Sequence, residues 1–150
     1  MILPLWQFKT ESHNINMNLS LGTADALAFE DGSFDVITLG FCLYLCDRKD
    51  LFKIAYEIDR CLKDDGYLVI KDFSPPFPYR NNYCHSDGIF SYKMKYPSMF
   101  EWNPNYFQIY NMVFTHSGND KREQPDERIA ITVLNKNTKQ AWTLNPFVDK

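Results

Sequence analysis

Residues 22–37 read GTADALAFEDGSFDVI, and this stretch decides the fold class of the chain. A short segment with an Asp-Ala pair leads into the acidic turn EDGS, and an almost continuous apolar run (FDVITLGF) then extends from Phe34 to Phe41. An apolar run of strand length bounded by a turn is typical of a strand that is buried on both faces. We therefore expect residues 34–41 to form such a strand.

A helix and a second strand are expected directly afterwards. From Asp47 the sequence DRKDLFKIAYEIDRCLKDDG places apolar residues at helical spacing, with Asp47 as a plausible N-cap and Gly66 as the stop. Residues 67–73 (YLVIKDF) then favour another buried strand, ended by the prolines of SPPFP. Strand, helix and strand imply a right-handed parallel crossover. The alternating residues 18–21 (NLSL) predict one further short strand before it.

The second half of the chain has a different composition. Aromatic residues are dense between Phe73 and Phe114, and we expect a loop-rich segment there with one short helix near residues 96–102. Residues 105–115 (NYFQIYNMVFT) and 128–134 (RIAITVL) are strand candidates, and the polar stretch between them has the composition of a hairpin loop. They predict a final antiparallel pair that closes the sheet.

Composition narrows the function classes. A length of 150 residues suits one domain. A net charge of −3 argues against a nucleic-acid-binding protein, because binding to phosphates requires an excess of positive charge. The four cysteines form no C-x-x-C pair, which favours a reduced, cytoplasmic chain. The start MILPLWQFKT lacks the basic residues and apolar length of a signal peptide, and no apolar run approaches the roughly 18 residues of a membrane span.

Four pieces in order carry a family resemblance. GTADALAFEDGSFDVITLGFCLYL, followed by a helix that ends in RCLKDDGYLVIKDF, resembles the second half of the Rossmann-like S-adenosylmethionine-dependent methyltransferases, methyltransferase type 11-like. The resemblance implies an α/β fold with parallel strands, a crossover helix and a C-terminal antiparallel strand pair. It divides a single domain into residues 1–18 outside the clear match, a core match at 19–73, an aromatic substrate region at 74–104 and the terminal strand pair at 105–136.

The resemblance also implies a cofactor site. The family's acid at the position of Asp25 accepts a hydrogen bond from the adenine amino group, and the N–H of Ala26 would donate to the neighbouring ring nitrogen. Leu39 and Gly40 would approach the methionine part, because ligands of open parallel sheets bind outside the carboxyl ends of the strands. Tyr44 could line the same pocket or simply pack. Asp25 could equally cap the turn that follows it.

Catalytic residues are less defined. Asp72, at the end of a strand, could face the substrate or cap the next turn, and His85 is the histidine to test as a general base. No pair of histidines has zinc-like spacing, so no metal site is expected. Aromatic side chains of the variable segment could form a substrate wall or fill an irregular core, and we select three of them for the substrate region: Tyr83, Tyr92 and Trp102.

One family element is missing. The chain contains no G-x-G loop, and the residues before Leu19 are too few for two strands and two helices, so the resemblance begins at the third strand. In the family's usual strand order, 3-2-1-4-5-7-6, the absence of the first two strands would leave the strand from Phe34 to Phe41 with an open edge. Such an edge invites an N-terminal half-domain or a second copy of the chain.

These observations lead to two functional expectations. The first is methyl transfer from S-adenosylmethionine to a small-molecule acceptor, with weak or partner-dependent cofactor binding and doubtful activity of this chain alone. The alternative is a non-catalytic fragment or subunit that pairs with a partner through the exposed strand edge.

Overall fold

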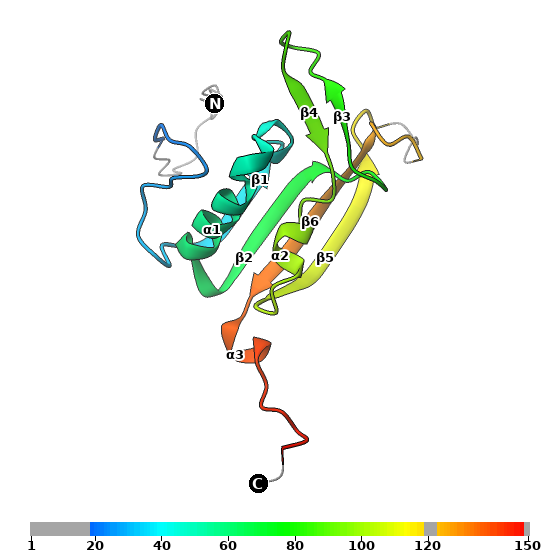
Figure 1. Ribbon diagram of the computed structural model, residues 1–150. Coiled ribbons are helices and arrows are strands. Elements are labelled where there is room, and N and C mark those ends of the chain that lie inside the picture. The colour runs from blue at the N-terminus through cyan, green and yellow to red at the C-terminus, as the bar shows by residue number, and fades with distance from the viewer. Residues whose placement is uncertain (1–18, 119–122, 149–150) are drawn as a thin grey trace, which may run out of the picture.

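The computed structural model describes residues 19–118 and 123–148, and its centre is a mixed sheet with the strand order β1-β2-β6-β5 (Figure 1). A separate small sheet pairs β3 with β4. The strands are β1 (Phe34–Gly40), β2 (Leu62–Phe73), β3 (Tyr79–Asn82), β4 (Phe90–Lys93), β5 (Tyr106–Thr115) and β6 (Arg128–Lys136). The helices are η1 (Leu43–Leu45), η2 (Arg48–Asp50), α1 (Leu51–Cys61), α2 (Ser98–Glu101) and α3 (Thr138–Ala141). Within the described ranges, no helix has the length and apolar character needed to cross a membrane.

The expected parallel crossover is present. β1 and β2 run parallel, with Val36 opposite Tyr67 and Gly40 opposite Lys71, and α1 connects them. Asp47 caps the 3-10 turn η2, because its carboxylate accepts a hydrogen bond from the N–H of Lys49 at 3.2 Å. This turn leads directly into α1, whose own N-cap is Asp50. Apolar residues from α1, the sheet, η1 and the segment around α2 form one core, which includes Leu43, Leu51, Ile54, Ile58, Leu62, Leu68, Ile70, Tyr96, Phe100 and Leu134.

The expected helix stop at Gly66 is wrong. α1 ends at Cys61 and β2 begins at Leu62. Gly66 is instead required by close packing: a Cβ there would lie 2.9 Å from both Leu62 Cδ1 and the Lys63 carbonyl oxygen, and 3.0 Å from the Asp35 carbonyl oxygen. The glycine therefore lets the start of β2 pass close to β1.

The final antiparallel pair is confirmed, but the aromatic segment is more regular than expected. β6 pairs antiparallel with both β2 and β5 and so lies between them. The short helix near residues 96–102 is present as α2. The hairpin of β3 and β4 was not predicted, because YRNN and FSYK are only four residues long and pair only with each other within the described chain.

The sheet order β1-β2-β6-β5 corresponds to the second part of the family order, 4-5-7-6, so the expected fold class is confirmed. The expected short strand before β1 is wrong for residues 19–21, while Asn18 lies outside the described residues. Leu19 and Leu21 are 69% and 73% exposed, and a four-residue run without a hydrogen-bonding neighbour does not form a strand.

β1 therefore pairs only with β2 among the described residues, and its other edge is open. The expectation that β1 is buried on both faces is wrong, because Val36 is 53% exposed and Thr38 is also exposed. An apolar run predicts burial only when both neighbouring strands and both covering layers are present.

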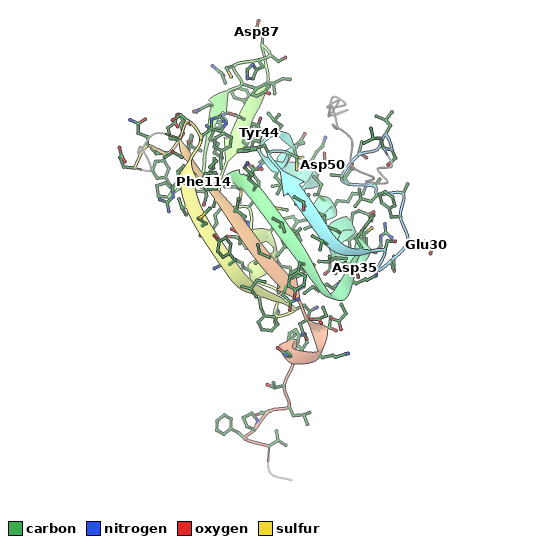
Figure 2. The ribbon with its side chains drawn as sticks, turned by 180° about the vertical axis from the view of Figure 1, so that it is seen from behind. Glu30, Asp35, Tyr44, Asp50, Asp87 and Phe114 are labelled. Carbon is green, nitrogen blue, oxygen red and sulfur yellow. The ribbon has the colours of Figure 1, made fainter. Side chains whose placement is uncertain are left out.

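One face of the sheet also carries no helix from the described part of the chain. α1 and α2 lie on the same face, and the view from behind shows the four strands with no helix of the described chain in front of them (Figures 1 and 2). The strand register places several large apolar side chains on that rear face, since directly opposed residues share a face. They are Val36, Tyr67, Phe107, Tyr110 and Met112, each between 39% and 53% exposed.

We expect Gly66→Ala to lower the free energy of unfolding by about 1–3 kcal/mol, because the new methyl group meets two backbone carbonyl oxygens that cannot move freely. Gly22→Ala is the matched control, since no atom lies within 4 Å of a Cβ built there. Urea denaturation of both variants measures the difference. Equal stabilities would contradict the close approach of β1 and β2 at Gly66.

Candidate functional site

A charged pair on α1 holds the segment that carries the expected cofactor residues. Arg60 donates from Nη1 to the Phe29 carbonyl at 2.7 Å and from Nη2 to the Leu27 carbonyl at 3.0 Å. Glu57 accepts from the Leu27 N–H at 2.9 Å and from Arg60 Nη2 at 2.8 Å. Hydrogen bonds from Arg60 hold the pKa of Glu57 below its usual value. Residues 27–31 are thus fixed to α1 by a bidentate arginine rather than by a strand.

Asp25 lies at a turn directly before this segment and lines a cavity of about 190 Å³. The walls of this cavity, here called the Asp25 cavity, are residues 22–25, 45–47, 49, 50 and 54. Asp25 accepts a hydrogen bond from Lys53 Nζ at 3.3 Å, and Thr23 and then Lys53 lower its pKa. The N–H of Ala26 donates to the Thr23 carbonyl at 3.2 Å, which closes the turn. Asp25 is therefore a charged carboxylate at the wall of a cavity.

Leu39 and Gly40 lie at the carboxyl end of β1, as expected, but neither lines the Asp25 cavity. Leu39 lines a separate apolar groove of about 280 Å³ along β1, here called the β1 groove, with walls at residues 24, 27, 29, 34, 36–39 and 58. Gly40 is exposed, and no atom lies within 4 Å of a Cβ built on it. The space beside the end of β1 is therefore open among the described residues.

Tyr44 belongs to an aromatic cluster. It lies where β1 ends, at the opposite end of the strand from Asp35 (Figure 2). Its ring makes edge contacts with Phe73 at 5.2 Å and with Tyr83 at 6.3 Å between centroids. Burial, followed by the hydrogen bond with Tyr83, raises the pKa of Tyr44. Tyr44 does not line the Asp25 cavity, and its described contacts are with these aromatic rings.

Asp72 is buried at the carboxyl end of β2, with 3% of its surface exposed. Its Oδ1 accepts from the N–H of Phe73 at 2.7 Å, and Oδ2 has no hydrogen-bond partner within the described part of the chain. Burial raises the pKa of Asp72 to about 7, although the N–H groups of Phe73, Leu43 and Tyr44 partly offset it. None of the described cavities that we identify is lined by Asp72.

Arg48 is a site residue that the sequence did not indicate. It donates from Nη2 to the carbonyl oxygens of Leu43 and Cys46, and from Nη1 to the Tyr96 hydroxyl at 2.8 Å. Its guanidinium carbon lies 4.4 Å from the ring centroid of Tyr92. Arg48 thereby fixes the turn after β1, whose residues 45–47 line the Asp25 cavity, to the aromatic segment.

The three aromatic residues selected for the substrate region do not form one wall. Tyr83 contacts Tyr44, and Tyr92 lies under Arg48, so both are near the end of β1. Trp102 is 71% exposed and lines a different cavity between α1 and α2, together with Phe52 and Tyr56.

His85 is exposed in the loop of the β3–β4 hairpin and makes an edge contact with Tyr83 at 5.2 Å. Asp87 of the same loop lies at the tip of the hairpin (Figure 2). The structure therefore brings His85 close to Tyr83 and, through it, to Tyr44, but not to Asp25.

Arg60 could have been found from the sequence, because it belongs to the quoted RCLKDDG piece and follows Glu57 by three residues on a helix. Arg48 and Lys93 gave no such signal. Their partners lie far away in the chain: Arg48 contacts Tyr96, and Lys93 donates to Asp126 at 2.8 Å.

Comparison with known proteins agrees with this geometry. Residues 4–70 match the family model described as a methyltransferase domain. An uncharacterized methyltransferase, YcgJ, from Bacillus subtilis is 35% identical over 80 residues, which are 52% of this chain and 30% of that protein. The ubiquinone/menaquinone biosynthesis C-methyltransferase UbiE of Citrifermentans bemidjiense is 35% identical over 68 residues, covering 45% of this chain and 28% of that protein.

Solved structures share the fold at low sequence identity. A methyltransferase dependent on S-adenosylmethionine from Methanosarcina mazei has a TM-score of 0.58 at 17% identity, covering 77% of this chain and 65% of that one. The 1,6-didemethyltoxoflavin-N1-methyltransferase of Burkholderia thailandensis, solved with bound 1,6-didemethyltoxoflavin and S-adenosylhomocysteine, has a TM-score of 0.57 at 14% identity, covering 76% of this chain and 48% of that one.

These matches confirm the resemblance drawn from the sequence: the chain is similar to the later part of a Rossmann-like, S-adenosylmethionine-dependent methyltransferase domain. It spans less than a third of the length of the curated relatives described above. The roles of the individual site residues and the division of the chain into segments stay predictions.

The buried carboxyl of Asp72 gives a stability prediction with a defined sign. Its folded pKa of about 7 lies above the ordinary value of 3.8, so between these pH values the native state binds more protons than the unfolded state. The free energy of unfolding should therefore fall as pH rises from 5 to 8. One pKa unit corresponds to about 1.4 kcal/mol, and we expect Asp72 to contribute a fall of about 2–4 kcal/mol.

Urea denaturation at pH 5 and pH 8 tests this contribution. Asp72→Asn should remove that part of the pH dependence, because the amide does not titrate. Asp35→Asn is the control, since Lys63 holds the pKa of the exposed Asp35 below its ordinary value and its titration ends below pH 5. The same pH dependence in Asp72→Asn and in the natural chain would mean that Asp72 is not the titrating group.

Proposed function

We propose that this chain takes part in methyl transfer from S-adenosylmethionine to a small-molecule acceptor, and that it supplies only part of the donor site. The observation that carries the proposal is the Asp25 cavity, which lies between the segment before β1 and the turn after it in a sheet of methyltransferase order. Ligands of open parallel sheets bind at this end of the strands.

The residues of the chain fit one end of the cofactor. In the proposed complex the Asp25 carboxylate accepts a hydrogen bond from the adenine amino group in place of Lys53, and the Ala26 N–H faces the neighbouring ring nitrogen if its bond to Thr23 opens. The cavity of about 190 Å³ is smaller than the roughly 300–1,000 Å³ of complete ligand sites. We infer that cofactor binding by this chain is weak or depends on a partner.

When bound, the cofactor supplies a methyl group that its sulfonium already activates, so the protein mainly has to align donor and acceptor and exclude water. Leu39, Gly40 and Tyr44 are proposed at the donor side because they lie at or just beyond the end of β1. Tyr83 and Tyr92 are proposed on the acceptor side. His85 is retained as the candidate base, since it is exposed beside Tyr83. Asp72 is too buried to contact an acceptor, so His85 is preferred over Asp72 as the catalytic candidate.

The proposed partner is a polypeptide that completes the sheet. Among the described residues, the edge of β1 that faces away from β2 has unpaired backbone groups, and the adjoining β1 groove offers apolar side chains. A half-domain or a second copy of this chain could occupy both. The non-catalytic alternative would use the same edge without any donor binding. All four cysteines are free thiols, which suits a reducing, cytoplasmic setting.

Calorimetric titration with S-adenosylhomocysteine tests the donor site. We expect the chain alone to bind with a dissociation constant weaker than about 100 μM, because only the adenine side is present. Asp25→Ala should abolish this heat, whereas Asp35→Ala, which alters an exposed acid at the other end of β1, should leave it unchanged. Low-micromolar binding by the chain alone would contradict the incomplete site, and unchanged binding by Asp25→Ala would leave Asp25 with a turn-capping role.

Transfer of labelled methyl groups to a small-molecule extract separates the enzyme from the non-catalytic subunit. A polypeptide carrying the family's first strand, G-x-G loop and acidic second strand is added in trans, and we expect label transfer only in the mixture. Val36→Lys should weaken the reconstitution, because it puts a charge beside the open edge, while Phe52→Lys on the exposed side of α1 should not. Turnover by this chain alone would refute partner dependence; no binding and no turnover in the mixture would favour the subunit.

A further inference from the structure

A further cavity lies beside the β3–β4 hairpin. Its volume is about 250 Å³, and its walls are Arg48, residues 78–80 and residues 92–94; we call it the hairpin cavity. Arg48 stands between Asp47 and Lys49, both of which line the Asp25 cavity. The two cavities are therefore separated by the single turn η2.

The hairpin cavity is rich in positive charge, although the whole chain carries a net charge of −3. Arg48, Arg80 and Lys93 all line it. Lys93 is 8% exposed and is neutralised by Asp126, which accepts from its Nζ at 2.8 Å. Burial would raise the pKa of Asp126, but hydrogen bonds from Lys93, Tyr79 and Asn81 outweigh it and keep the pKa low.

The two arginines are not neutralised in the same way. Within residues 19–118 and 123–148, no carboxylate forms an ion pair with either guanidinium, although the buried Asp72 interacts electrostatically with Arg48. Arg80 is exposed and lies 4.5 Å from the ring centroid of Phe90. The Nε of Arg48 is buried and has no hydrogen-bond partner in the described chain. A buried donor without a partner is costly and is often satisfied by a ligand or an ion.

The remaining walls are flat and largely apolar. Tyr79 and Tyr92 come from the two paired strands of the hairpin, and Pro78 precedes the first. The guanidinium carbon of Arg48 lies 4.4 Å from the ring centroid of Tyr92. The hydroxyl of Tyr79 donates a hydrogen bond to Oδ1 of Asp126 at 2.7 Å. Tyr92 lies opposite Arg80 and Tyr79 lies opposite Lys93, so only the ring of Tyr92 shares a face of the hairpin with Arg80. The ring of Tyr92 can therefore contact a planar apolar body, while Arg80 and Arg48 attract an anionic group.

We propose that the hairpin cavity binds a small organic acid, with a carboxylate near Arg80 and Arg48 and a planar apolar body against the ring of Tyr92, which shares a face of the hairpin with Arg80. The planar guanidinium fork matches a carboxylate, and the volume suits a body of about one ring. The identity of this acid rests on the proposed function: because the hairpin cavity adjoins the donor side across η2, the acid bound there is the methyl acceptor. The acceptor then belongs to the acidic, single-ring compounds.

Binding of benzoate and of its neutral analogue benzamide to the full chain tests the assignment by amide NMR titration. Benzoate should shift amide signals of residues 78–80 and 92–94, and its affinity should exceed that of benzamide by about tenfold, the effect of a charge-assisted hydrogen bond. Arg80→Gln should lower the affinity for benzoate by a similar factor. Lys139→Gln, which removes an equal charge from α3, should not.

Arg80 is exposed, and the spectrum of the variant itself reports whether the fold is kept. Equal binding of benzoate and benzamide, shifts confined to other residues, no binding of benzoate up to about 10 mM, or unchanged affinity in Arg80→Gln would each overturn the assignment. S-adenosylhomocysteine is titrated separately into the same sample and should affect residues around Asp25. Failure of the donor site and failure of the acid site are thus observed independently.

Discussion

The parallel pairing of β1 with β2 is the constraint on which the rest of the structure depends. Because α1 returns the chain across the sheet, the carboxyl ends of both strands meet at one edge, and the turn after β1 comes to lie beside the end of β2. The pairing requires a close approach at Gly66, where no side chain fits. The Asp25 cavity and the hairpin cavity both lie near these carboxyl ends of the strands.

Two arginines then hold irregular segments where strands or longer helices would otherwise be needed. Arg60 binds carbonyls of the segment before β1, and Arg48 binds carbonyls of the turn after it. Each guanidinium replaces backbone partners that an irregular segment lacks. The Asp25 cavity lies between these two held segments, so its shape depends on side chains of η2 and α1 rather than on the sheet itself.

The sequence predicted those elements whose signal is local. The spacing of Leu51, Ile54 and Ile58 specified α1, and the apolar run of β1 specified a strand, because periodicity reflects which side is buried. The burial of β1 was overestimated, since a run of apolar residues does not reveal whether its neighbour is present. In the site, Asp25 was predicted from a motif. Arg48 was not, because it connects the turn after β1 to Tyr96, 48 residues away, and Lys93 was not, because its partner Asp126 is 33 residues away.

The central claim is that β1 forms an open edge of the sheet among the described residues, and residue-resolved hydrogen exchange of its backbone amides tests this most directly. Successive amides of a strand point to alternate sides, so an edge strand should show two classes between Phe34 and Gly40. Amides bonded to β2 should exchange slowly and the alternate ones rapidly. Equal, strong protection of all these amides in the chain alone would mean that another strand covers the edge, and would contradict the account.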